Sequence, residues 1–496
     1  MKKRFPDSVY NPVTMAGAVI SAISFGLILF LIILDIFAKD QNPYMGIITF
    51  IILPSALVFG LLLIAYGIYR EHKRIKSGKP TAVLPVIDLN NPKHRTAFLF
   101  FVCGTILLLV FTAFGSFKAY EYTESDQFCG MVCHKVMEPE YNAYQGSPHS
   151  KVGCVTCHIG AGTGWFVKSK LSGSYQVYSV LFNKYPRPIP TPIHNLRPAR
   201  ETCEQCHWTK KFYNEKLRTT SYFLNDENNS KWTIKLALKI GEGNPETGLT
   251  SGIHWHVNLE NEVRYISSDD KRMEIPVVIK RVKDGKDIVF KTTKNLPSKE
   301  ELSKLEIRTM DCIDCHNHPA HIYNPSSVSV NNYMSIGLIK KELPYIKSIS
   351  LQALDKTYKS KQEGLEGIKA LVEDFYRTNY PDVYKNQRNG ISEAVEQLKH
   401  IYERNYFPEM GVSWRKYPMQ VGHMFAPGCF RCHDGLHKSS DGKVISKDCN
   451  LCHTIISQQY ENETPMYSAA GLEYKHPVEI GKALTEMNCS DCHTKN

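Results

Sequence analysis

Residues 129–137 read CGMVCHKVM, and residues 154–158 read CVTCH. The second stretch has the order Cys-x-x-Cys-His, in which two thioethers hold a c-type haem and the adjacent imidazole reaches the iron. The first stretch has the same order, but one extra residue separates its cysteines, and Met137 follows His134 by three positions. Whether it is also a haem site depends on how often the pattern recurs.

The pattern recurs along the whole chain. Fourteen of the fifteen cysteines among 496 residues form seven pairs, each followed at once by a histidine, and six pairs have the two-residue spacing. Zinc sites do not place a histidine after every second cysteine. The sequence therefore predicts seven covalently bound haem c groups, or six if the first stretch is not a site. The predicted attachment residues are Cys129, Cys133, Cys154, Cys157, Cys203, Cys206, Cys312, Cys315, Cys429, Cys432, Cys449, Cys452, Cys489 and Cys492. The predicted proximal iron ligands are His134, His158, His207, His316, His433, His453 and His493.

Three apolar runs near the N-terminus lie at about 13–37, 46–69 and 97–117. Each is close to the roughly 20 residues that a membrane-spanning helix needs. The first run is too long for a cleaved signal peptide and lacks a convincing small-residue cleavage site. The sequence therefore predicts a three-helix transmembrane anchor over residues 1–117. Cys103 lies inside the third run, where a small buried hydrophobe is its expected role.

The charges flanking these runs predict their orientation. The loop at 70–96 carries seven Lys and Arg residues against two acidic residues, whereas the loop at 38–45 carries one Lys and one Asp. The positive-inside rule puts the N-terminus and the 70–96 loop in the cytoplasm, and residues 118–496 in the periplasm of a bacterial inner membrane. Haem attachment to cysteines takes place on that side. The formal charge of +11 omits the haem propionates, so it indicates no nucleic-acid partner.

The periplasmic part divides by its motif spacing. We expect a four-haem region at 118–321, a helical connector at 322–420 and a three-haem region at 421–496. Residues 366–379 and 391–405 in the connector have apolar residues at helical spacing. Residues 231–240, KWTIKLALKI, alternate as a half-buried strand does, which predicts a small β-rich insertion at about 210–305. The predicted fold class is a membrane-anchored multihaem cytochrome c, with a mostly α or irregular haem-packed domain after the anchor.

Each haem iron needs a second axial ligand or keeps an open position. Ten histidines lie outside the motifs and outside the predicted cytoplasmic loop. Several stand within a few residues of a motif, where they can bridge to a neighbouring haem. The predicted distal ligands are His149, His256, His321, His423, His437 and His476. His254 is the alternative to His256, His194 and His318 are in reserve, and His400 is expected to be structural.

Four stretches resemble the NapC/NirT/NrfH family of membrane-anchored multihaem quinol dehydrogenases. They are CGMVCHKVMEPE at 129–140, SPHSKVGCVTCHIG at 147–160, WFVKSKLSG at 165–173 and CIDCHNHPAH at 312–321. The resemblance implies that Met137 can serve as an axial ligand of the first haem, and that His149 and His321 are distal ligands. It also implies a quinol-site lysine, with Lys170 as first candidate and Lys168 as second.

The chain departs from that family's usual pattern of one transmembrane helix and four haems. Its layout looks like the inner-membrane heptahaem cytochromes of metal-reducing bacteria. The family's quinol-site acid has no obvious match, because no Asp or Glu occurs from 141 to 200, so Glu140 or Glu138 would substitute. Whether His134 or Met137 ligates the first iron stays open. The basic and aromatic stretch 141–200 also fits a collar at the membrane surface.

These observations predict a quinol dehydrogenase that oxidises membrane quinol, with menaquinol expected. Electrons would pass through the haems to periplasmic cytochromes, a reductase or outer-membrane acceptors in anaerobic or extracellular respiration. One alternative is a terminal reductase of a small oxyanion, which requires a haem with an open site. Another is a passive relay subunit within a larger membrane complex or homo-oligomer.

Overall fold

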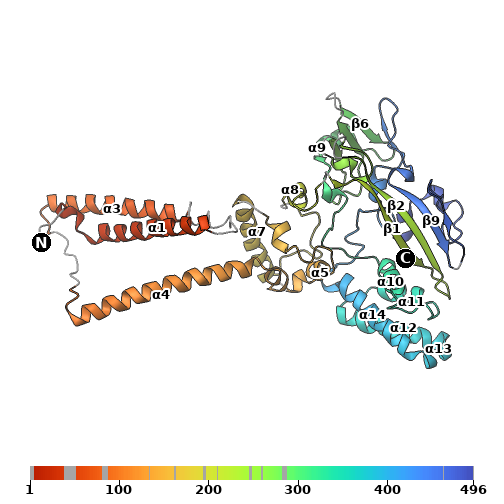
Figure 1. Cartoon of the computed structure of the whole chain (residues 1–496), viewed down its shortest axis with the longest axis horizontal. Helices are drawn as coiled ribbons and strands as arrows, with labels where there is room; N and C mark the ends of the chain where they lie inside the picture. The colour runs from red at the N-terminus through yellow and green to blue at the C-terminus, as the bar shows by residue number, and fades with distance from the viewer. Residues whose placement is uncertain are drawn as a thin grey trace. The chain divides into compact units, whose positions relative to one another are not determined.

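The structure is a computed structural model that describes residues 5–37, 52–80, 88–132, 134–160, 163–193, 197–208, 211–244, 248–258, 261–281, 287–461 and 463–494. The chain forms two compact units. The first comprises Met1–Ser125 and Ile159–Ser174, and the second comprises Asp126–His158 and Tyr175–Asn496. Figure 1 traces the elements of both in chain order.

The first unit is built from long helices. A short turn, η1 (Asp7–Val9), precedes α1 (Pro12–Phe37), α3 (Leu53–Lys76) and α4 (Pro92–Thr123), and α7 (Thr163–Leu181) begins in this unit. Figure 1 shows α1 and α3 side by side. Glycines allow this approach, because a Cβ on Gly17 would lie 2.6 Å from the Gly60 carbonyl oxygen. Close packing through small residues is how helices associate where no hydrophobic effect can drive them together.

Two helices of the described residues are long and apolar enough to cross a membrane, Pro12–Leu31 and Leu53–Lys76. This differs from the predicted three. The third predicted run, 97–117, is helical within α4, but several of its side chains lie outside the described set and it is not among the two candidate spans. The start of the second predicted run, 46–51, also lies outside the described residues. The structure thus supports a membrane anchor with two candidate spans, and a third span stays a prediction.

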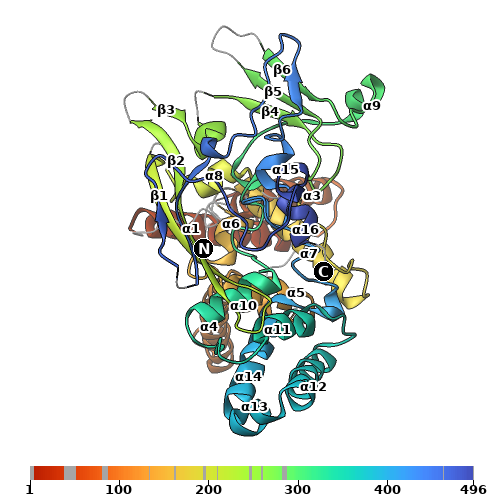
Figure 2. The same ribbon diagram turned by 90° about the vertical axis from the view of Figure 1, so that its right-hand side faces the viewer.

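Helices fill the stretch between the two groups of haem motifs. They are α10 (Ser326–Ser335), α11 (Ile346–Asp355), α12 (Lys361–Asn379), α13 (Pro381–Asn386) and α14 (Arg388–Asn405). Ile368 and Val372 of α12 and Leu398 and Ile401 of α14 are at most 1% exposed. Apolar residues at spacings of three and four form one face of each helix, so the two faces meet in a hydrocarbon core. Figure 2 shows α12, α13 and α14 grouped at one end of the second unit.

Two five-stranded sheets form the β part of the second unit. One contains β1 (Asn214–Phe223), β2 (Lys231–Asn244), β9 (His453–Tyr460) and β10 (Met466–Tyr467) in that order, with β3 (Gly248–Ser251) paired to β2. The other has the order β7 (Ile307–Thr309), β4 (Val263–Ile266), β5 (Val277–Arg281), β6 (Asp287–Thr292) and β8 (His437–Ser439). All their pairings are antiparallel.

The sheets correct the expectation of a small insertion in a mostly α or irregular domain, because the fold mixes helices and sheets. Neither sheet is completed within 210–305. β9 pairs with β2, opposing His453 to Leu238, and β8 pairs with β6, opposing His437 to Thr292. β8 follows the fifth motif, and β9 begins at His453 of the sixth motif. The β part therefore joins the two groups of haem motifs.

Short helical turns carry the haem motifs. They are η3 (Phe128–Val132) with α5 (His134–Gln145), α6 (Cys154–His158), α8 (Ala199–Cys203), η6 (Cys312–Asp314), η8 (Gly428–Arg431), η9 (Cys449–Leu451) and α16 (Cys489–His493). The remaining elements are η5 (Ile253–Val257), α9 (Lys299–Lys304), η7 (Pro408–Met410) and α15 (Ala483–Glu486). One helical turn brings residues three and four apart onto one face. In Cys-x-x-Cys-His the second cysteine and the histidine follow the first cysteine by three and four residues, so all three side chains can contact the same haem.

Candidate haem sites and quinol site

The motif histidines stand opposite histidines from elsewhere in the chain. All six Cys-x-x-Cys-His motifs have such a partner. The ring centroids are 6.1 Å apart for His158 and His321, 6.0 Å for His207 and His149, 6.4 Å for His316 and His254, 5.7 Å for His433 and His256, 6.2 Å for His453 and His423, and 6.3 Å for His493 and His476. A metal bound between two imidazoles at about 2 Å from each nitrogen sets the centroids roughly 6 Å apart. These pairs therefore fit a haem iron with two axial histidines.

The opposed histidines are also oriented as ligands. Nδ1 of His149, His254, His256 and His321 bonds a backbone carbonyl oxygen, of Pro319, Ile240, Ile253 and Glu140, at 3.1, 3.1, 3.0 and 2.9 Å. A carbonyl oxygen only accepts, so Nδ1 carries the proton. The lone pair then resides on Nε2, which is the usual arrangement of a metal-binding histidine.

Five of the six predicted distal ligands face a motif histidine, and the sixth, His437, has other partners. His149, His256, His321, His423 and His476 each face a motif histidine. His254, predicted only as an alternative to His256, faces His316 as well. Among the side chains that the structure describes, His437 faces no motif histidine, and His254 takes the position opposite His316.

Both ring nitrogens of His437 are already engaged. Nδ1 lies 2.9 Å from Oδ1 of Asp434, and Nε2 lies 2.7 Å from the Ile275 carbonyl oxygen. Burial opposes charge on this ring, but the hydrogen bonds to Asp434 and Ile275 and the negative charge of Asp434 together outweigh it and raise the pKa of His437. No nitrogen of His437 is left for a metal.

The remaining histidines have other surroundings. His194 lies outside the described residues. His318 is buried, with its ring centroid 5.6 Å from that of Tyr417, and burial lowers its pKa to about 4. His400 is 63% exposed, as expected for a histidine of the helical connector without a role at a haem.

A π-helical turn accommodates the extra residue of the first motif. Residues Phe128–Val132 form η3, and π-helical turns of this kind are single-residue expansions that are frequent at functional sites. Gly130 is required there, because a Cβ on it would lie 2.0 Å from Cδ2 of Tyr141. Met137 is half-buried on α5, one turn after His134. Cys133 lies outside the described residues.

Successive haem motifs contact one another. The thiols of Cys129 and Cys154 are within hydrogen-bonding distance, as are those of Cys203 and Cys312. Cys429 and Cys452 form a third such pair. These contacts join the first motif to the second, the third to the fourth and the fifth to the sixth.

Arg431 and Asp314 connect the fourth motif to the fifth. Nη2 of Arg431, between Cys429 and Cys432, donates to the Asp314 carbonyl oxygen at 2.7 Å. The Asp314 carboxylate, between Cys312 and Cys315, is 2% exposed and accepts from Arg272 at 2.8 Å and Arg308 at 2.9 Å. Together these bonds tie the four-haem region to the three-haem region.

The predicted quinol-site lysine has a carboxylate partner in the first unit. Nζ of Lys170, on α7, lies 2.6 Å from Oε1 of Glu124, which directly follows α4. Glu124 is 14% exposed and Lys170 41%. Lys168 instead places its Nζ 4.6 Å from the centroid of the Trp165 ring. The sequence prediction missed Glu124, since only residues 141–200 and the acids just before them were considered.

The two acids predicted as substitutes lie in the second unit. Glu138 forms an ion pair with Lys361, at 3.2 Å. The backbone carbonyl of Glu140 accepts from His321, and among the described residues its buried Oε2 has no hydrogen-bond partner. Burial raises the pKa of Glu140 to about 7. Glu140 is thus associated with a distal-ligand candidate, while Glu124 is the carboxylate on Lys170.

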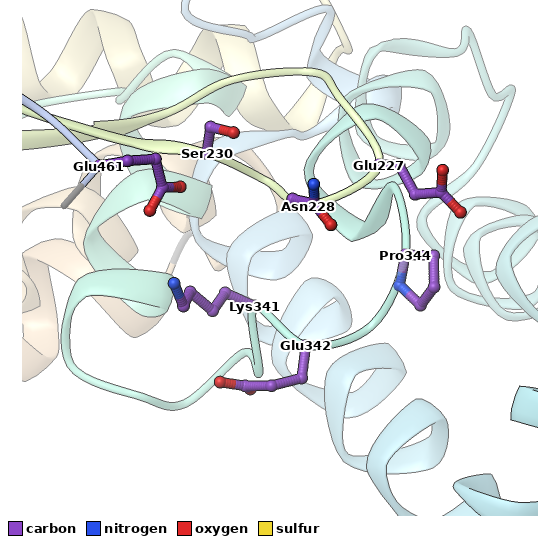
Figure 3. A pocket seen from close by; sticks show the side chains of 7 residues that line it. All are labelled: Glu227, Asn228, Ser230, Lys341, Glu342, Pro344 and Glu461. Atoms are coloured by element: carbon purple, nitrogen blue, oxygen red, sulfur yellow. The ribbon is translucent and has the colours of Figure 1, made fainter. Parts of the chain in front are cut away.

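One cavity lies away from all of these groups. Its volume is about 500 Å³, and Figure 3 shows it between the turn that joins β1 to β2 and the loop before α11. It is lined by Glu227, Asn228, Ser230, Lys341, Glu342, Pro344 and Glu461. None of these residues belongs to a haem motif, and we assign the cavity no part in redox chemistry.

Comparisons with known proteins agree with the geometry. Residues 91–189 match the family model of the NapC/NirT cytochrome c family, N-terminal region. The chain is 43% identical over 487 residues to the cytochrome c-type protein ImcH of Geobacter sulfurreducens, covering 98% of this chain and 95% of that protein. No solved structure is a significant match. The chain belongs to the NapC/NirT cytochrome c family.

Proposed function

We propose that this protein is an inner-membrane heptahaem c-type cytochrome that oxidises membrane quinol, with menaquinol as the expected substrate. It would pass the electrons to periplasmic or outer-membrane acceptors. The observation that carries the proposal is the set of six opposed histidine pairs, each at a Cys-x-x-Cys-His motif and each spaced for one iron. When bound, haem c supplies a one-electron iron couple at each site.

The protein's own residues would hold and orient these groups. The seven cysteine pairs would form the thioethers, and two imidazoles would close the axial positions at six sites. Closed axial positions leave no place for a small substrate, which favours electron transfer over reduction of an oxyanion at those sites. The cysteine contacts bring six of the sites together in three pairs, and the Arg431–Asp314 hydrogen bond links the second of these pairs to the third.

The first site differs from the other six. Its proximal ligand would be His134 or Met137, which are three residues apart on α5 and therefore on the same side of that helix. The motif's extra residue lies in the π-helical turn η3 just before α5, and this departure from the other six motifs supports Met137 as the ligand.

Lys170 and Glu124 are the proposed quinol-binding pair. An ammonium group can donate a hydrogen bond to a quinol oxygen, and a carboxylate at 2.6 Å can take up a proton that the quinol releases. Lys168 and Glu140 are weaker candidates. The Lys168 ammonium lies over the Trp165 ring, and the Glu140 backbone carbonyl accepts from His321. The anchor would hold this pair near the bilayer, with the N-terminus in the cytoplasm and the haem domain in the periplasm.

A passive relay is the second candidate function. The long exposed apolar face of α4, which includes Phe100, Leu108 and Phe111, offers room for helices of a partner subunit or a second copy as well as for lipid. A relay would receive its electrons from a separate quinol-oxidising subunit.

Stopped-flow absorbance of the purified oxidised protein, mixed with a menaquinol analogue, separates the two. We expect fast haem reduction that a quinol-site inhibitor blocks and that Lys170→Met slows by at least an order of magnitude. Lys118→Met, which removes a lysine paired with Glu121 on α4, is the matched control. Haems that dithionite reduces but quinol does not would make the protein a relay.

A further inference from the structure

His437 is a buried histidine that the haem sites do not use. It is 1% exposed and begins β8, four residues after the motif histidine His433. Its two ring nitrogens bond Oδ1 of Asp434 and the carbonyl oxygen of Ile275, at 2.9 and 2.7 Å. Carbonyl oxygens and ionised carboxylates both accept hydrogen bonds and cannot donate them. Both ring nitrogens must therefore donate, which makes the ring an imidazolium.

The counter-charge is the residue next to a proposed iron ligand. Asp434 directly follows His433, and its carboxylate also accepts from the Leu436 amide at 2.8 Å. Its side chain is 21% exposed, against 2% for that of His437. An anion in this position favours the oxidised, more positively charged form of the fifth haem, and a cation beside it opposes that effect.

The ion pair is built into the support of that site. Nδ1 of His433 donates to the Ser446 carbonyl oxygen at 2.9 Å, and the adjacent Ile445 amide donates to the backbone oxygen of His437 at 3.0 Å. Ile275 belongs to the hydrophobic cluster against which Cys432 packs. The imidazolium is thus fixed from two sides by the elements that position the fifth haem's cysteine and histidine.

We propose that the Asp434–His437 ion pair sets the reduction potential of the haem attached at Cys429 and Cys432, with His437 masking the negative charge of Asp434. This rests on the proposed haem ligation, in which His433 and His256 bind that iron. His437 acts through Asp434 and is not a ligand. The fifth haem connects the four-haem region to the three-haem region, so its potential governs the passage of electrons between them.

Redox titrations of the full-length, haem-loaded protein test the proposal as a double-mutant cycle. We expect His437→Gln to lower one of the seven midpoint potentials and Asp434→Asn to raise the same one. The double variant should return it close to the wild-type value. His256→Met changes the ligation of the fifth haem and identifies which midpoint belongs to it. The matched controls are His400→Gln and Asp441→Asn, both at exposed positions.

Haem content and the low-spin spectrum are measured on each variant, so a fault in ligation is seen separately from a shift in potential. Dithionite drives the titration, so the result does not depend on quinol oxidation. Unchanged midpoints in both single variants, or shifts in the same direction, would overturn the proposal. If His437→Gln loses haem, the test rests on Asp434→Asn. An unchanged midpoint potential of the fifth haem in that variant would contradict the proposal.

Discussion

The helical connector and the haem-bearing regions of the second unit are held together by different means. In the connector, Ile368, Val372, Leu398 and Ile401 belong to a large cluster of buried side chains, which also reaches Val136 and Ala143 on α5. Around the motifs the buried clusters are small, and the one beside Cys432 contains six buried residues. Opposed histidines and cysteine pairs occupy the space that apolar side chains fill in the connector. The difference indicates that the connector can fold without haem, whereas the haem-bearing regions need it.

The largest effect is expected from producing the full chain without haem attachment. Limited proteolysis read by mass spectrometry should then cut within 126–321 and 421–494 and spare 326–405. Without haem, nothing joins the two histidines of each pair, whereas the buried apolar side chains of the connector still pack against one another. Equal protection of all three stretches, with haem shown to be absent, would refute the comparison.

A core substitution in the connector comes next. Leu398→Ala removes a side chain that is fully buried on α14, and such truncations cost about 2–5 kcal/mol. The same cluster reaches Val136 on α5, so any change in haem absorbance should be confined to the first site and the six Cys-x-x-Cys-His sites should keep their spectrum. Chemical denaturation followed by circular dichroism measures the cost, and Leu338→Ala, at a 44% exposed position, serves as control. A loss of haem signal in Leu398→Ala would mean that the two regions are not separable.

His254→Met should leave the fold nearly as stable and alter one haem. The thioether can replace the imidazole opposite His316, and methionine ligation raises a haem's potential relative to two histidines. Electron paramagnetic resonance should show one bis-histidine signal fewer, with all seven haems attached. His318→Met is the buried control, and an unchanged spectrum for His254→Met would remove His254 from the ligand set.

A pH-dependent effect is expected from a lysine buried in the connector. Burial lowers the pKa of Lys347 to about 7, and its Nζ donates to the Ser327 carbonyl oxygen at 2.8 Å. Between about pH 7 and the usual lysine pKa, the unfolded chain binds the proton that the folded chain lacks, so the free energy of unfolding rises with pH. Lys347→Met should abolish this rise. The gain in the free energy of unfolding over the wild-type protein should be largest at pH 7 or below. Denaturation curves from pH 6 to 10 measure both; parallel pH profiles would contradict the prediction.

The candidate attachment motifs could be located in the sequence because thioether chemistry fixes their spacing. The histidines that face the motif histidines in the structure could be predicted only in part. His437 stands four residues from His433, but β8 turns its ring toward Asp434, so nearness in sequence was misleading. His254 was expected only as an alternative to His256, which would leave one ligand. Both lie on the 3₁₀ turn η5, where residues two apart point in different directions and can serve two haems.

Long-range pairing explains what else the sequence did not reveal. The strands β8 and β9 complete sheets that begin far earlier in the chain, at β4 and β1, and such a long-range pairing leaves no local signal in the sequence. Glu124 lies 46 residues before Lys170 along the chain, so only the folded chain brings the carboxylate to the ammonium. The helices of the connector, by contrast, follow from local periodicity and could be predicted.

Magnetic circular dichroism in the near infrared, on the fully oxidised protein with its haem content measured by the pyridine haemochrome method, tests the central claim most directly. The method distinguishes bis-histidine, histidine–methionine and high-spin haems by their charge-transfer bands. We predict seven haems per chain, with six bis-histidine haems and a first haem of a different class. Fewer than six bis-histidine haems in a fully loaded protein would contradict the account and would direct attention to a reductase with an open iron site.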